Sequence, residues 1–267
     1  MEKIDKLREC LLSLGSVAVA FSGGVDSTFL LKAAHDDLKD KCIAVTADSS
    51  LFPKREIDEA RLFCEKEGIK HIIIKRDEFM IDGFAKNPPD RCYHCKKALF
   101  EDIKKAIDET GIENIVEGSN TDDEKDYRPG MRAVRENNIR SPLMESMMSK
   151  KDIRELSRKL GLATSEKTSF ACLASRFAYG EEITREMIEK VDKAEQFLID
   201  LGFGQLRVRV SNKSARIEIM PEEFFMMTEY ADRVYKYLTE LGFIYVALDL
   251  GGYRTGNMNK GLEDKNG

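Results

Sequence analysis

Hydrophobic and polar residues alternate in blocks along the first part of the chain. Short apolar runs with the length of buried strands are separated by longer stretches in which apolar residues recur at helical spacing. The predicted strands lie at residues 17–21, 42–46, 71–74, 114–117 and, more weakly, 139–141. The predicted helices lie near residues 28–35, 54–67, 95–108 and 131–137. Because strands that alternate with helices are joined by crossover connections, this pattern predicts an α/β fold with an open parallel sheet.

The pattern changes after a further predicted helix at residues 150–160, and residues 162–180 are irregular. A helix, two strands, a helix and a strand follow, at residues 182–201, 205–210, 214–220, 221–241 and 243–248. We therefore predict two domains. Residues 1–180 form the larger α/β domain, and residues 181–267 form a smaller αββαβ domain.

Composition narrows the class of protein. The 267 residues include 43 Lys and Arg against 48 Asp and Glu, a net charge of −5, which argues against a dedicated nucleic-acid binder. No apolar run approaches the roughly 18 residues of a membrane span. The first residues are charged and lack the apolar core of a signal peptide. We expect a cytoplasmic protein that binds neither nucleic acid nor membrane.

A candidate phosphate site follows the first predicted strand directly. The chain there reads Ser22-Gly23-Gly24-Val25-Asp26-Ser27-Thr28 before the helix begins. Two glycines let the backbone approach a pyrophosphate closely, and the N–H groups at a helix start point toward it. No lysine follows the glycines, so this is not a Walker A loop. A carboxylate beside a polyanion predicts an intervening Mg²⁺. A capped glycine-rich turn without a ligand is the less favoured alternative.

These residues match the SGGxDS motif of the PP-loop, or N-type ATP pyrophosphatase, superfamily, whose members adenylate a substrate and release pyrophosphate. The resemblance implies their adenine nucleotide alpha hydrolase-like fold, with ATP and Mg²⁺ as cofactors and Asp26 as a catalytic residue. It also implies that the polar and glycine residues of the loop bind the nucleotide, namely Ser22, Gly23, Gly24, Asp26, Ser27 and Thr28. The motif is specific for the superfamily and not for the substrate.

Four further motifs select a family. They lie at residues 46–50, 117–123, 126–130 and 171–177. Together they resemble the LarE family of ATP-dependent sulfur transferases, over essentially the whole chain. The resemblance adds Thr46, Ser49, Glu117 and Gly118 to the ATP site.

This resemblance also implies a reaction. The substrate is pyridinium-3,5-biscarboxylic acid mononucleotide, a small nucleotide. ATP activates one of its carboxylates as an acyl-adenylate, and sulfur then replaces AMP to give a thiocarboxylate. The product leads to the nickel-pincer nucleotide cofactor of lactate racemase. A homo-oligomer is expected on the same ground.

The sulfur centre implied by the family is Cys172, a catalytic residue. In the simplest members this cysteine gives up its own sulfur and becomes dehydroalanine, so each protein turns over once. This chain adds Cys92 and Cys95 at the start of a predicted helix, where both thiols face one side. Three cysteines can hold a [4Fe–4S] cluster with one iron open to an additional sulfide. Family members with all three cysteines resemble that design, and sulfide or another sulfur donor then refills the site.

Alternatives to the cluster remain open at this stage. Cys172 could give up its own sulfur while Cys92 and Cys95 take no part in the reaction. Alternatively, that pair could bind zinc or act in redox chemistry. His94 could be a fourth ligand, although an exposed histidine is favoured. We interpret the other three cysteines as buried structural thiols, at Cys10, Cys42 and Cys64.

A second anion site is implied near the C-terminal strands. Arg207 and Arg209 alternate with apolar residues on a predicted strand. An ordinary half-solvated sheet explains that pattern without a ligand. The family resemblance implies instead that the substrate phosphate is held by Ser175, Arg176, Arg207 and Arg209, and guanidinium groups suit phosphate well. Glu195 matches a family position near this pocket and could ligate a metal or be an exposed helix residue. A role for Glu218 is weaker still.

Three rival functions share parts of this pattern. A cluster-dependent tRNA thiolase would have the same loop and cysteines, but the acidic composition argues against it. An amide-forming ATP pyrophosphatase such as an NAD synthetase gives the cysteines no role. A nucleotide-binding or cluster-binding scaffold protein would lack ATP-dependent pyrophosphate release.

Overall fold

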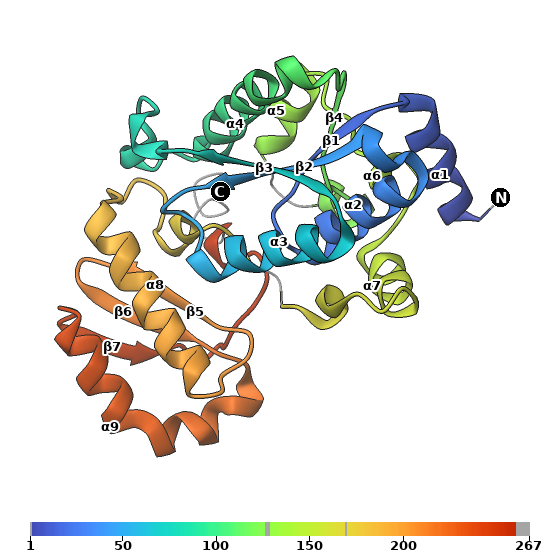
Figure 1. Cartoon of the computed structure of the whole chain (residues 1–267). Coiled ribbons are helices and arrows are strands. Elements are labelled where there is room, and N and C mark those ends of the chain that lie inside the picture. The colour runs from blue at the N-terminus through green and yellow to red at the C-terminus, as the bar shows by residue number, and fades with distance from the viewer. Residues whose placement is uncertain (1, 126–128, 169, 260–267) are drawn as a thin grey trace. The chain divides into compact units, whose positions relative to one another are not determined.

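The computed structural model describes residues 2–125, 129–168 and 170–259 (Figure 1). The chain divides into two compact units, the first made of residues 1–81 and 90–169, the second of residues 82–89 and 170–267. The division therefore falls at residue 169, whereas the sequence placed the domain boundary at residue 180. The segment 171–176 belongs to the second unit because its side chains and backbone hydrogen-bond within that unit. Arg176 donates to Glu195, and the Ser175 carbonyl accepts from Arg209.

The first unit is built on a parallel sheet, and the predicted α/β fold is confirmed. Four strands form it among the described residues: β1 (Val17–Ala20), β2 (Cys42–Asp48), β3 (Lys70–Lys75) and β4 (Asn114–Val116). Their order in the sheet is β3-β2-β1-β4, with every pair parallel. The order thus reverses at β1, so the carboxyl ends of β1 and β4 form a topological switch point, where ligands of open α/β sheets bind.

The weak strand predicted at residues 139–141 was wrong. This segment makes only an isolated parallel bridge, between Val116 and Arg140. The segment is too short to add a strand to the hydrogen-bonded sheet, because α6 (Pro142–Glu145) begins directly after it.

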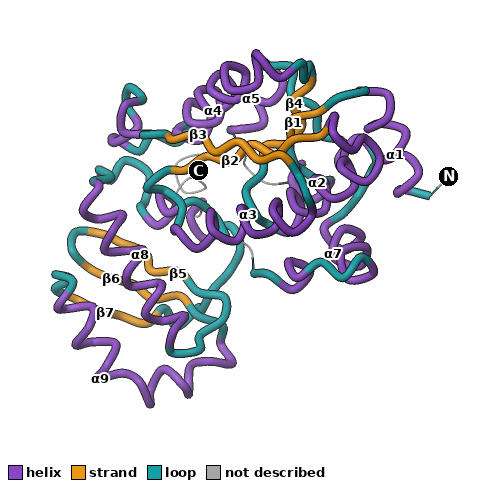
Figure 2. The backbone as a smooth tube through the Cα atoms, viewed as in Figure 1, coloured by secondary structure: helices purple, strands orange, loops and turns teal. Residues whose placement is uncertain are grey.

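Helices cover both faces of the sheet, as Figures 1 and 2 show. One apolar cluster joins Val17 and Val19 to residues of α1 (Lys3–Leu14), α2 (Val25–Leu38), α3 (Lys54–Glu67) and α7 (Lys150–Lys159). The other joins Ala18 to α4 (Arg91–Ile107) and α5 (Gly130–Glu136). Neighbouring residues of β1 face opposite sides of the sheet, as a strand requires, and both sides are buried.

Two helices begin earlier than their apolar spacing predicted. Helix α2 starts at Val25, immediately after the glycine pair. Helix α4 starts at Arg91, so Cys92 lies in its first turn and Cys95 at the start of the second. In each case the first turn is polar on its exposed side, and spacing of apolar residues gives no signal there.

The cysteines outside the candidate site differ in burial. Cys42 and Cys64 are buried in the core beside β1, and burial raises the pKa of each thiol to about 12. The prediction was wrong for Cys10, which is only partly buried and has its Sγ 3.4 Å from a carboxylate oxygen of Glu145.

The second unit confirms the predicted αββαβ order. It contains α8 (Arg185–Asp200), β5 (Arg207–Ser211), β6 (Ser214–Glu218), α9 (Phe224–Glu240) and β7 (Tyr245–Leu248). The strand order is β5-β6-β7, with β5 and β6 antiparallel and β6 and β7 parallel. Residues 82–89 join this unit through backbone bonds, including Ile183 N–H to the Ala85 carbonyl at 2.8 Å. No helix in the described part of the chain is long and apolar enough to cross a bilayer.

Candidate functional site

The glycine loop turns sharply from β1 into α2. Gly23 has φ +70°, and a Cβ atom there would lie 3.3 Å from the backbone oxygen of Glu56. This backbone conformation and this close approach both favour glycine. Gly24 is the extended N-cap of α2, so the N–H groups of the first helical turn face the loop.

Two serine hydroxyls hold the shape of this loop. The Oγ atoms of Ser22 and Ser27 lie 3.0 Å apart, and the backbone N–H of Ser22 donates to Ser27 Oγ at 3.3 Å. Two other oxygens beside them, Thr28 Oγ1 and Asp26 Oδ1, are buried without a hydrogen-bond partner among the described residues. Buried oxygens are rarely left unbonded, so these two suit an ion or ligand.

Asp26 combines burial with a nearby cation. Burial raises the pKa of its carboxyl group, and Lys150, whose Nζ lies 3.4 Å from Oδ2, opposes that rise. A carboxylate oxygen beside hydroxyl groups at a phosphate loop has the chemistry of an Mg²⁺ ligand. The predicted loop residues therefore come together in a geometry suited to a polyphosphate and its metal ion.

Sequence reasoning missed one residue at this loop, Lys167. Its Nζ donates to the Gly23 carbonyl at 3.2 Å, to Glu56 Oε2 at 2.7 Å and to Glu59 Oε2 at 2.6 Å. Arg154 holds the same segment by donating to the Lys167 carbonyl at 2.9 Å. A lysine in an irregular stretch carries no periodic signal, so only the fold could reveal that it reaches the loop.

Gly118 meets this loop from the end of β4. A Cβ atom at Gly118 would lie 3.1 Å from the backbone nitrogen of Ser27. The close approach requires glycine and brings two of the predicted nucleotide-binding motifs together at the switch point. The motif residues 126–128, also part of the resemblance, lie outside the described residues.

Glu117, beside that glycine, carries a buried carboxylate in a dense network. It accepts from Lys96 Nζ at 2.9 Å, from Ser141 Oγ at 2.6 Å and from Ser119 Oγ at 2.8 Å. Burial opposes ionisation, but the lysine and the hydroxyl donors outweigh it, so the pKa of Glu117 is lowered. Its carboxylate thus holds the end of β4 in place.

Thr46 and Ser49, which the family resemblance adds to the ATP site, shape the end of β2. Thr46 Oγ1 donates to the Phe21 carbonyl at 2.8 Å and also lies 2.8 Å from His71 Nε2. Ser49 Oγ accepts from the Leu51 backbone N–H at 3.1 Å. Their contact with ATP stays a prediction.

The paired cysteines stand on α4, the helix that also carries Lys96. Cys92 and Cys95 are both partly buried, and none of the six cysteines forms a disulfide. His94 is half exposed, with Nε2 3.2 Å from Asp90 Oδ2. Cys172 belongs to the second unit, and within either unit no three described His, Cys, Asp or Glu side chains group closely enough to hold a metal ion. The proposed three-cysteine ligand set therefore stays a prediction.

The predicted phosphate residues of the second unit form a buried network around Arg176. This side chain is fully buried, and its Nε and Nη2 atoms donate to the two carboxylate oxygens of Glu195 at 2.8 and 2.7 Å. Its Nη1 donates to Ser175 Oγ at 2.8 Å. Glu195 is 2% exposed, so the alternative of an exposed helix glutamate was wrong.

Two further arginines lie in the same network. Arg209 donates from Nη1 to the Ser175 carbonyl at 2.7 Å and from Nε to Glu218 Oε2 at 3.0 Å. Burial lowers the pKa of Arg207 to about 10, and the positive charge of Arg176 adds to that shift. Because Arg207 and Glu218 are buried, the alternative of an ordinary half-solvated sheet was also wrong. The four residues come together, and their contact with a phosphate stays a prediction.

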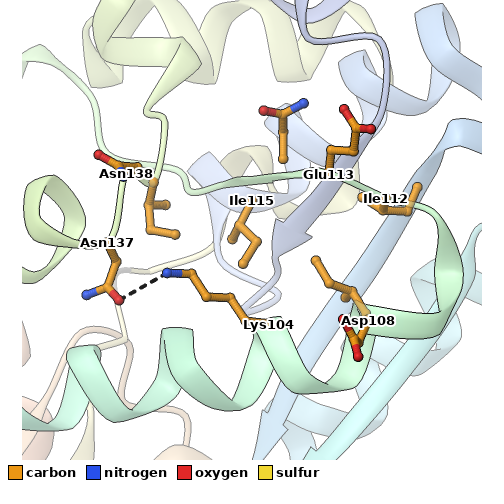
Figure 3. Close-up of a pocket in the computed structure, with 10 residues that line it drawn as sticks. Lys104, Asp108, Ile112, Glu113, Ile115, Asn137 and Asn138 are labelled. Atoms are coloured by element: carbon orange, nitrogen blue, oxygen red, sulfur yellow. Dashed lines mark hydrogen bonds between the residues drawn. The ribbon is translucent and has the colours of Figure 1, made fainter.

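An open pocket of about 470 Å³ lies at the other end of β4 from Gly118 (Figure 3). It is lined by residues from the C-terminal part of α4, the start of β4 and the end of α5, with Lys104 Nζ 3.3 Å from Asn137 Oδ1. No predicted site residue lines it. The pocket is at the amino end of β4, away from the switch point.

Known proteins resemble this chain over nearly its whole length. It is 40% identical over 253 residues to the pyridinium-3,5-bisthiocarboxylic acid mononucleotide synthase of Lactiplantibacillus plantarum, covering 94% of this chain and 92% of that protein. It is 38% identical to an uncharacterized protein of Synechocystis sp., covering 97% and 98%. A subunit of the glutamine-hydrolyzing GMP synthase of Archaeoglobus fulgidus is 24% identical over 73% of this chain and 67% of its own length. No family model matches the sequence.

Proposed function

This chain belongs to the family of the pyridinium-3,5-bisthiocarboxylic acid mononucleotide synthase of Lactiplantibacillus plantarum, and from that premise we propose that it is an ATP-dependent sulfur transferase. The proposed substrate is pyridinium-3,5-biscarboxylic acid mononucleotide, and the proposed product is a thiocarboxylate for the nickel-pincer nucleotide cofactor. The observation that carries the proposal is the 40% identity across 94% of the chain. The loop geometry at Gly23 supports it.

The first proposed step is adenylation. A substrate carboxylate oxygen bonds to the α-phosphorus of ATP, and the bond from that phosphorus to the bridging oxygen breaks to release pyrophosphate. The N–H groups at the start of α2 and the hydroxyls of Ser22, Ser27 and Thr28 are suited to hold the departing anion. Asp26 would hold the Mg²⁺, which neutralises the charge that develops on pyrophosphate.

The second proposed step forms a carbon–sulfur bond. A sulfur nucleophile attacks the acyl carbon, and AMP leaves with the electron pair of the broken carbon–oxygen bond. If Cys172 supplies the sulfur, its thiolate forms a thioester. The Cβ–Sγ bond then breaks as the Cα proton is lost, which leaves dehydroalanine and the thiocarboxylate.

We propose that Cys92, Cys95 and Cys172 instead hold a [4Fe–4S] cluster that spares the protein sulfur. Two of the thiols lie about one helical turn apart near the start of α4, and neither is in a disulfide. Three thiolates with partial solvent access suit such a cluster, which when bound supplies an open iron for an added sulfide.

Charge supports a substrate phosphate in the second unit. Arg176, Arg207 and Arg209 outnumber the two buried glutamates that this network contains, Glu195 and Glu218. The positive charge of Arg176 helps to lower the pKa of Arg207, and a bound phosphate would relieve that repulsion. We propose Ser175, Arg207 and Arg209 as its ligands.

Mass spectrometry after turnover tests the proposal. The full chain, purified anaerobically with iron and sulfide, is incubated with ATP, Mg²⁺ and the mononucleotide. We expect pyrophosphate, a thiocarboxylate product, an unchanged protein mass over several turnovers and an absorption band near ~400 nm. A protein that loses one sulfur at Cys172 would contradict the cluster and keep the sulfur transferase. Absence of both pyrophosphate and thiocarboxylate would contradict the function itself. Cys92→Ala is expected to remove the absorption band, and Cys10→Ala is the control.

A further inference from the structure

The guanidinium group of Arg176 binds the backbone on both sides of the sulfur-centre residue. Its Nη1 donates to the Ala171 carbonyl at 2.6 Å and to the Cys172 carbonyl at 3.3 Å. We propose that Arg176, fixed by Glu195, is a positioning residue that aims the Cys172 thiol at the acyl group. The inference rests on the proposed function and deepens it.

Glu195 gives this arginine a rigid support. The carboxylate and guanidinium meet as two parallel forks at 2.8 and 2.7 Å, a pairing that fixes orientation as well as distance. Glu195 Oε1 also accepts from the Val208 backbone N–H at 2.9 Å. One carboxylate therefore fastens Arg176 to both α8 and β5.

The hydrogen bonds to the Ala171 and Cys172 carbonyls fix the direction of the Cα–Cβ bond of Cys172. Cys172 is the N-cap of a short 3-10 helix, Leu173–Arg176, and its carbonyl also accepts from the Ser175 N–H at 2.9 Å. Leu173 and Ala174 are fully buried. With the peptide groups before and after Cys172 both held, its φ and ψ have little freedom, and so its Cα–Cβ bond has one direction.

The same contacts argue against Arg176 as a phosphate ligand. The side chain is 0% exposed, and its hydrogen bonds reach two carboxylate oxygens, two carbonyls and one hydroxyl. The two N–H groups of Nη1 are shared among the two carbonyls and the hydroxyl, while Nε and Nη2 both bind Glu195. Turning the group toward a phosphate would break the pair with Glu195 and leave a buried carboxylate uncompensated, which is strongly unfavourable.

Two variants separate positioning from folding. Arg176→Lys keeps the charge but lacks the planar fork, so it loses the simultaneous hold on Glu195 and the two carbonyls. The double variant Arg176→Met with Glu195→Leu removes both charges of the pair, so neither is left buried without the other. Arg233→Ala is the matched control in the same unit, because that arginine is exposed on α9 and its guanidinium lies 5.4 Å from the centre of the Tyr230 ring. Circular dichroism establishes that each protein is folded.

The first readout does not depend on any enzyme activity. Iodoacetamide alkylation of Cys172 is followed by peptide mass spectrometry on the full chain after iron chelation, with Cys92 and Cys95 as internal references. We expect alkylation of Cys172 to accelerate about fivefold or more in both variants, because a released loop exposes the thiol more often. The alkylation rates of the reference cysteines, and of Cys172 in the Arg233→Ala protein, should not change. An unchanged Cys172 rate in the folded variants overturns the proposal.

The second readout links the geometry to the reaction. Thiocarboxylate formation should fall about 100-fold, the scale expected for a small misplacement of a reacting group. Single-turnover pyrophosphate release at saturating mononucleotide should stay within about twofold, because that step does not use the Cys172 thiol. A raised KM for the mononucleotide with unchanged sulfur transfer would make Arg176 a phosphate ligand and overturn positioning. Loss of activity in the unmodified protein as well would instead contradict the proposed function.

Discussion

Lys96 Nζ lies 2.9 Å from Glu117 Oε2, and this ion pair joins the helix of the paired cysteines to the end of β4. Gly118, the next residue, contacts the start of α2 beside the phosphate loop. One chain of contacts within the first unit thus connects the N-terminal part of α4 to the glycine loop at the start of α2.

Removal of Lys96 is expected to destabilise the first unit. Lys96→Met leaves the buried Glu117 carboxylate with two hydroxyl donors and the Ser119 backbone N–H but no cation. We expect a loss of about 1–3 kcal/mol, less than for a fully buried pair because Lys96 is partly exposed. Urea unfolding at pH 7 measures it. Lys105→Met on the same helix, a highly exposed lysine 3.8 Å from Asp102, should change stability by less than about 0.5 kcal/mol.

The effect of Lys96→Met should depend on pH. Despite burial, Lys96 and the hydroxyl donors hold the pKa of Glu117 below its ordinary 4.5. A lowered carboxyl pKa contributes stability that is full above pH 4.5 and is lost as the pH falls through the folded pKa. The difference between the two proteins should therefore be constant from about pH 6 to 7 and shrink below the ordinary pKa. A difference that grows on acidification would contradict this assignment.

Lys167 is expected to hold the phosphate loop in shape. Lys167→Met frees the Gly23 carbonyl and leaves Glu56 and Glu59 without their shared cation, next to a site that must accept a polyanion. We expect KM for ATP in pyrophosphate release to rise about tenfold, a loss of roughly 1.4 kcal/mol of binding. Lys159→Met, which removes an exposed lysine paired with Glu155, is the control. Equal KM values for the two variants would count against this role.

Gly23 can be tested against a glycine of matched conformation. Gly23 and Gly68 have φ values of +70° and +68°, but a Cβ atom at Gly68 would meet no atom within 4 Å. Substitution of either by alanine should cost about 1 kcal/mol in stability, because both backbones are left-handed. Only Gly23→Ala should also lower ATP-dependent pyrophosphate release, by more than about tenfold, since its methyl group would press on the Glu56 backbone. Similar activity in both variants would show that the close approach is unimportant.

Asp26→Asn should separate stability from activity. Burial raises the pKa of Asp26 above its ordinary 3.8, so the ionised group destabilises the folded protein at neutral pH. The variant should be more stable than the parent at pH 7, by about 1 kcal/mol, and the gain should vanish below the ordinary pKa. Mg²⁺-dependent pyrophosphate release should fall at least about 100-fold, because the proposed metal ligand is lost. Retention of activity would contradict the role of Asp26.

Several features could be predicted without the fold because they depend on contiguous residues. The alternation of strands and helices follows from local periodicity, and the loop at residues 22–28 is a short motif with its own turn chemistry. Helix starts were less accurate, as at Arg91, since a polar first turn has no apolar spacing to mark it. The cysteine motif and its place at the start of a helix were predicted, but the first helical residue was not.

The sequence by itself determined the parallel sheet, the glycine-rich loop after its first strand and the family to which the motifs point. Each of these depends on residues that are neighbours in the sequence. Only the tertiary structure decided which charged groups are buried and what they bind. Lys167 reaches Gly23 across 144 positions, and Arg176 meets Glu195 across 19. A buried charge is stable only when its partner lies within hydrogen-bond distance, and no local pattern encodes a partner supplied by a distant element.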